Sequence, residues 1–114
     1  MIQGAFQLGS QIVIAEVNGE GLIFKDITNA TIIAPKFGYN KVIKEFPDLK
    51  DDPEWSMKAE QRFIDFFYKI PGEMKKIFYI AEELKKVGYM PLYWRKQGFR
   101  SQKFRDKDLE VSYE

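Results

Sequence analysis

The sequence predicts an α+β fold: one small single domain with an N-terminal antiparallel β-meander, two packed α-helices and a C-terminal basic strand or hairpin. Residues 1–35 contain short β-branched runs, whereas apolar residues in 53–87 recur every three or four positions, as on one face of a helix. The length of 114 residues is typical of one domain, and 45% of them are apolar, so a core can form without a disulfide or a metal. We therefore expect residues 1–114 to fold as a single domain.

The β-rich part, residues 1–35, is expected to hold three strands. Residues 11–17 are rich in Ile and Val, residues 21–25 are also mostly apolar, and Asn18-Gly19 between them favours a type I′ hairpin turn. The next two residues leave room for a bulge or a longer loop. Residues 30–34 are predicted to form a third strand that Pro35 ends. Residues 36–52 are predicted to be a loop, with room for a short element at 41–46.

Two helices follow, at about 53–69 and 73–87. Asp52 is a preferred N-cap residue and Pro53 suits the first helical position. The first helix has an apolar face made of Trp55, Ala59, Phe63, Phe66, Phe67 and Ile70. Pro71-Gly72 separates the helices, and Gly88 suits the position after the second helix. Because the linker is short, the helices should pack as a hairpin or at a steep angle.

The basic extended segment 89–105 and the residues around it carry the strongest charge signal. Residues 85–107 contain eight Lys or Arg residues and one acid, whereas the whole chain has a net charge of +1. Cations and aromatic rings together suit phosphates and stacked bases, but rings pointing inward with cations outward also describe a half-buried strand. The residues expected to meet a nucleic acid or an acidic partner are Lys85, Lys86, Tyr93, Trp94, Arg95, Lys96, Phe99, Arg100, Lys103 and Arg105. The tail, residues 106–114, is expected to be frayed.

Several function classes lack their chemistry in this sequence. The chain has no Cys and no His, which removes thiolate nucleophiles, disulfides, the serine triad and the commonest metal ligands. The carboxylates in residues 48–54 lack EF-hand spacing, so we expect a solvated loop and no metal. No catalytic residue, cofactor or phosphate-binding glycine loop is predicted. Without a signal peptide or a membrane-length apolar run, the protein is expected to be cytoplasmic, with no membrane partner.

The first helix has more aromatic residues than one sheet can cover. Phe63, Phe66, Phe67 and Tyr68 occupy more than one helix face and predict an interface, with homo-oligomerisation as one form of it. We therefore expect a non-enzymatic structural or adaptor subunit acting through protein–protein contacts. The acidic stretch 45–65 and the basic stretch 85–107 would set its orientation. The alternative is a small nucleic-acid-binding module using residues 85–107. Exposed rings around Trp94 would favour the alternative, and buried rings the adaptor.

Overall fold

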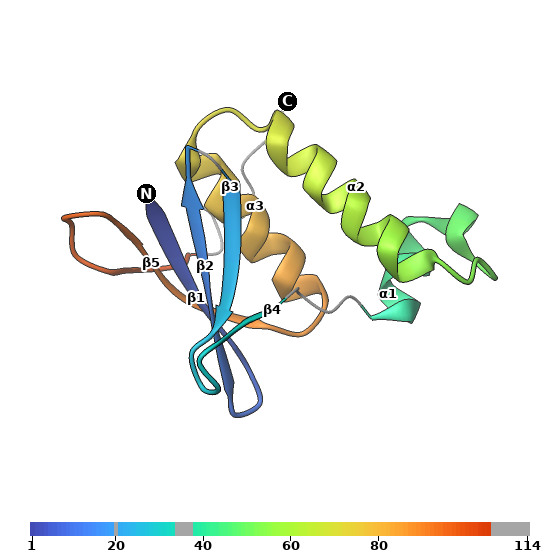
Figure 1. The fold of residues 1–114 in the computed structure, drawn as a ribbon, viewed down its shortest axis with the longest axis horizontal. Helices are drawn as coiled ribbons and strands as arrows, with labels where there is room; N and C mark the ends of the chain where they lie inside the picture. Colours follow the sequence, from blue (N-terminus) through green and yellow to red (C-terminus); the bar gives the residue numbers. More distant parts are fainter. Residues whose placement is uncertain (20, 34–37, 106–114) are drawn as a thin grey trace.

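The computed structural model describes residues 1–19, 21–33 and 38–105, with the side chains of residues 32 and 33 left aside. One six-stranded antiparallel sheet has the order β4-β3-β2-β1-β5-β6, and its helices lie on one side (Figure 1). The strands are β1 (Ile2–Leu8), β2 (Gln11–Asn18), β3 (Gly21–Asp26), β4 (Thr31–Ile33), β5 (Met90–Lys96) and β6 (Gln102–Lys103). The helices are α1 (Tyr39–Glu45), the 3-10 turn Pro47–Leu49, α2 (Trp55–Lys69) and α3 (Glu73–Lys86). The predicted fold class is confirmed.

The meander has four strands, so the prediction of three was wrong. The missed strand is β1, which lies in the middle of the sheet between β2 and β5. Its residues alternate between the two faces, but one inward position is Gly4, which weakens the sequence signal for a strand. The predicted β2–β3 hairpin forms, and Asn18 pairs with Gly21. Gly19 does not have the positive φ that the predicted type I′ turn requires.

Helix α3 packs on β1, β2 and β5, and α2 extends the same layer toward β3. Gly4 allows a close approach here, because a Cβ on it would lie 3.0 Å from Ile77 Cδ1 of α3. The two helices and the inner sheet face share one buried core, which includes Phe6, Phe67 and Phe78. No helix in the described part of the chain packs against the opposite sheet face, which we call the open face.

The short element for which 41–46 left room forms as α1, and the 3-10 turn follows it, so the segment 36–52 is less of a loop than expected where the structure describes it. Helix α1 and the 3-10 turn surround a second small core of Val42, Leu49 and Ala59. Helix α1 has only seven residues, so the helical spacing of its apolar residues covers only about two turns. Its burial against α2 therefore depends on tertiary packing.

The ends of the two long helices follow the predicted signals in part. Helix α2 begins at Trp55, and Asp52 is not its N-cap. Instead, Asp52 Oδ1 accepts the Glu54 backbone N–H at 2.8 Å, which forms a turn before the helix. Helix α3 ends as predicted: Gly88 has φ +106°, and the backbone N–H of Tyr89 donates to the Leu84 carbonyl. This is the Schellman pattern, which satisfies carbonyls of the last turn.

The basic segment forms a hairpin that projects beyond the sheet (orange in Figure 1). Strand β5 pairs with β1 along its length, and β6 pairs with β5 at two positions. The turn after Lys96 closes with a hydrogen bond from the Phe99 backbone N–H to the Lys96 carbonyl, and Gly98 has φ +82°. The predicted tail, residues 106–114, lies outside the described residues.

Candidate functional site

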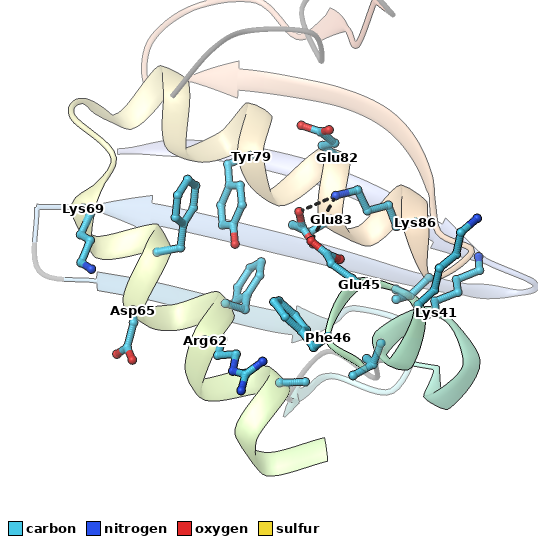
Figure 2. A pocket seen from close by; sticks show the side chains of 16 residues that line it. Lys41, Glu45, Phe46, Arg62, Asp65, Lys69, Tyr79, Glu82, Glu83 and Lys86 are labelled. Carbon is cyan, nitrogen blue, oxygen red and sulfur yellow. Dashed lines mark hydrogen bonds and ion pairs between the residues drawn. The ribbon is translucent and has the colours of Figure 1, made fainter. Parts of the chain in front are cut away.

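A groove of about 1150 Å³ lies between α1, α2 and α3, and we call it the helical groove. Helices α2 and α3 meet at Pro71-Gly72 and diverge from there, and α1 lies near their open end (Figure 2). The groove is somewhat larger than the usual 300–1000 Å³ of a drug-sized site. Several large side chains of a partner would fit in it.

The groove has an apolar surface built from all three helices. The Tyr79 ring of α3 lies 5.2 Å from the Phe63 ring and 4.9 Å from the Phe66 ring of α2. Phe63 and Tyr79 are buried, but Phe66 keeps 41% of its surface exposed. The other apolar residues of the lining are Val42, Phe46, Ala59 and Val87. An exposed aromatic ring beside an apolar surface is typical of a contact site.

An ion-pair network joins α1 to α3 at the groove. Lys86 Nζ lies 3.0 Å from Glu83 Oε1 and 3.7 Å from Glu45 Oε1. Burial raises the pKa of Glu83, although its hydrogen bond and charge interaction with Lys86 lower it in part. For Lys86 burial disfavours the charged form, but Glu83 and Glu45 outweigh it and raise the pKa of its ammonium. These groups would lose more water if a partner covered the groove.

Arg62 of α2 contacts the chain at and just after the end of α1 (Figure 2). Its guanidinium donates to both carboxylate oxygens of Asp48 at 3.2 and 2.5 Å, and its carbon Cζ lies 4.7 Å from the centroid of the Phe46 ring. The hydrogen bond from Arg62 lowers the pKa of Asp48. A bidentate pair has a defined geometry, so it holds the segment after α1 beside α2.

The four residues predicted as an interface lie in different environments in the structure. Phe63 and Phe67 belong to the core, with exposed fractions of 5% and 1%. Phe66 lines the helical groove, and Tyr68 is exposed outside the groove lining. The exposed part of the predicted interface is therefore Phe66 and Tyr68, on different parts of α2.

The ten residues predicted for nucleic acid or an acidic partner also separate. Strand alternation places Trp94 inward, edge-on to Phe78, so it is a core residue. Tyr93 and Arg95 of β5 lie on the open face, and Lys103 of β6 pairs beside Tyr93. Lys96, Phe99, Arg100 and Arg105 are exposed on or beside the hairpin. Lys85 and Lys86 lie at the end of α3, apart from the hairpin strands, and Lys86 lines the helical groove.

The exposure of the rings around Trp94, which was expected to distinguish the adaptor from the nucleic-acid-binding module, therefore gives a divided result. Trp94 is buried, as the adaptor interpretation expects, whereas Tyr93 and Phe99 keep 40% and 66% of their surfaces exposed. Each interpretation retains its own surface, since the helical groove and the basic hairpin share no residue.

The carboxylates after α1 serve local structure. Asp48 pairs with Arg62, and Asp52 pairs with Lys58 at 2.6 Å. The described residues contain no cluster of three or more potential ligand side chains placed to hold a metal ion. The acidic stretch 45–65 contacts the basic stretch 85–107 through the Glu45–Lys86 ion pair.

Sequence reasoning missed the contribution of α1 to the groove. Tyr39, Val42, Ile43 and Phe46 have spacings of three and four that could have indicated an apolar helix face. Tyr79 was also missed, because it directly follows Ile77 and Phe78 and no apolar residue stands three or four positions after it.

No helix in the described ranges combines the length and apolar character needed to cross a bilayer. Comparison with protein-family models, curated proteins and solved structures finds no significant match to this chain.

Proposed function

We propose that the protein is a non-enzymatic structural or adaptor subunit that binds another protein chain through the helical groove. The observation that carries this proposal is the apolar surface of a groove between three helices, with Phe66 exposed in it. Binding a partner there would remove this apolar area from water, which is the main favourable contribution in protein association.

A second copy of the same chain is the partner that the charges favour. The groove lining has five cations and four acids: Lys41, Lys44, Arg62, Lys69 and Lys86 against Glu45, Asp65, Glu82 and Glu83. A lining of one sign would repel an identical lining in a twofold contact. Mixed charges allow each copy to place acids opposite cations of the other, as a symmetric interface requires.

The test is sedimentation equilibrium from about 5 to 500 µM, with a matched pair of variants on α2. Phe66→Ser removes the exposed ring in the groove, and Tyr68→Ser removes a more exposed ring outside it. The wild-type chain should dimerise as concentration rises. Phe66→Ser should weaken dimerisation at least tenfold, because central aromatic residues carry a large share of interface energy, and Tyr68→Ser should leave it unchanged.

Circular dichroism of both variants controls for folding, since Phe66 also contacts Tyr79 within the chain. A chain that stays monomeric at 500 µM would contradict self-association through the groove. Dimerisation that responds to Tyr68→Ser and not to Phe66→Ser would place the interface elsewhere on α2.

A further inference from the structure

The basic hairpin carries a second surface, distinct from the helical groove. Between Gly88 and Arg105 the chain has five cations and no acid: Arg95, Lys96, Arg100, Lys103 and Arg105. The first four form no ion pair with any carboxylate in the described part of the chain. A projecting element with one sign of charge attracts a polyanion, and it gains affinity by releasing the polyanion's counterions.

The strand register sorts these side chains by face. Tyr93 pairs with Ala5 on β1 and with Lys103 on β6, and Arg95 follows two residues later on the same face. All three residues therefore lie on the open face, away from α2 and α3. Trp94 points the other way into the core, so the ring available on this face of β5 is Tyr93.

The open face beside the hairpin also carries cations, which take part in a row of polar contacts across four strands. Arg95 Nη2 donates to Gln3 Oε1 at 3.3 Å, and Gln3 Nε2 donates to Glu16 Oε1 at 3.1 Å. Lys25 Nζ lies 3.2 Å from the same Glu16 oxygen. The row thus has a cation at each end and one carboxylate between them. Glu16 is the acid that an approaching phosphate would meet.

Two exposed rings complete the surface. Tyr93 keeps 40% of its surface exposed between Arg95 and Lys103, and Phe99 keeps 66% exposed in the turn of the hairpin. Bases stack on exposed aromatic rings only when they are unpaired, because the faces of paired bases lie within the duplex stack. One ring on the sheet face and one in the turn, both near cations without ion pairs, therefore favour single strands over duplex.

We infer that the basic hairpin and the adjoining open face bind single-stranded nucleic acid. Arg95, Arg100 and Lys103 contact phosphates, and Tyr93 and Phe99 stack on bases. The site is separate from the helical groove, so it does not depend on the adaptor proposal. Lys85 and Lys86 are not part of it.

The experiment is fluorescence anisotropy of the full chain with labelled single-stranded and duplex oligonucleotides at 50 and 200 mM salt. If Arg95, Arg100 and Lys103 each engage one phosphate, affinity for the single strand should fall about 20-fold between these salt concentrations, at a log–log slope near −2.1. The triple variant Arg95→Ala, Arg100→Ala, Lys103→Ala should make the slope shallower by about 2. Its matched control is Lys50→Ala, Lys75→Ala, Lys85→Ala, which changes the net charge equally on exposed positions outside both this surface and the helical groove.

Three further variants separate stacking from charge. Tyr93→Leu should weaken single-strand binding about tenfold, whereas Tyr68→Leu, an exposed tyrosine on α2, should not. Glu16→Gln should bind more tightly at 50 mM salt, with a smaller gain at 200 mM. Phe66→Ser, which tests the groove, should leave oligonucleotide binding unchanged.

Three results would overturn the inference. The first is no binding at 50 mM salt. The second is equal weakening by the two triple variants, which would reduce the effect to net charge. The third is tighter binding of duplex than of single strand, with Tyr93→Leu unchanged.

Discussion

Gly4→Ala tests the close contact that fixes α3 on the sheet. An ideal Cβ at position 4 would lie 3.0 Å from Ile77 Cδ1 and 3.0 Å from Cε2 and Cζ of Phe6. Ile77 and Phe6 are both fully buried, so a shift of either side chain would press on other atoms of the close-packed core. Overpacking of this kind costs about 1–3 kcal/mol of unfolding free energy. The loss of glycine entropy in the unfolded chain offsets about 0.5–1 kcal/mol. We expect a net loss of about 1–2 kcal/mol.

The measurement is urea unfolding followed by circular dichroism. With a slope of about 1.5 kcal/mol per molar urea, the midpoint should fall by roughly 1 M. Gly38→Ala is the control, because Gly38 has φ −72° and no atom lies within 4 Å of its Cβ position. That variant should unfold at or slightly above the wild-type midpoint.

A double-mutant cycle assigns the cost to one atom. Ile77→Val removes Cδ1 and should alone cost about 0.5–1.5 kcal/mol. In the double variant, the removal of Cδ1 should make room for the new Cβ at position 4. The double variant should therefore lose about 0.5–1 kcal/mol less unfolding free energy than the sum of the two single losses. Full rescue is not expected, since the Phe6 ring remains in place. Strict additivity, or a Gly4→Ala variant as stable as wild type, would refute the packing argument.

Three further predictions concern stability. Gly88→Ala should cost about 1–3 kcal/mol of unfolding free energy in the same urea assay, because Gly88 has φ +106° at the end of α3. Two carboxyls should show opposite pH dependence in urea unfolding from pH 3 to 8. The Gln11 hydrogen bond lowers the pKa of Asp26, so its stabilising contribution is present above the unfolded value near 3.9 and is lost as pH falls through the folded pKa; Asp26→Asn should remove this loss. Burial raises the pKa of Glu83, so stability should instead decline as pH rises from about 4.3 through the folded pKa, and Glu83→Gln should abolish that decline. Trp94→Phe should change the free energy of unfolding by no more than about 1 kcal/mol. It loses side-chain volume, but it also removes a buried Nε1–H that has no hydrogen-bond partner among the described residues, and the two effects offset each other. A loss above about 3 kcal/mol would contradict this.

The sequence was sufficient where the signal was local. Proline and glycine at 71 and 72 separated two helices whose apolar residues had a clear period, and both helices formed within two residues of the predicted ends. Gly88 predicted the end of α3 because only a positive φ there completes the Schellman pattern. Strands β2 and β3 were also recognisable, since β-branched residues favour extended backbone.

Weak local signals hid other parts of the fold. Strand β1 has Gly4 at an inward position, where the needed property is the absence of a side chain against α3. Helix α1 is short, and its apolar residues are buried because α2 packs beside them. Asp52 suited two different turns, and hydrogen bonding to Glu54 and Lys58 selected the one outside the helix.

The sequence by itself determined the α+β class, the two long helices, the lack of Cys and His, and the concentration of cations near the C-terminus. Only the tertiary structure decided which of those residues share a surface. Tyr93 and Trp94 are neighbours in sequence, yet the period of two residues in a strand sends one ring to the open face and the other to the core. The helical groove likewise combines α1, α2 and α3 from residues 41 to 87, because a cavity depends on how helices diverge in space, and no local pattern of residues encodes that angle.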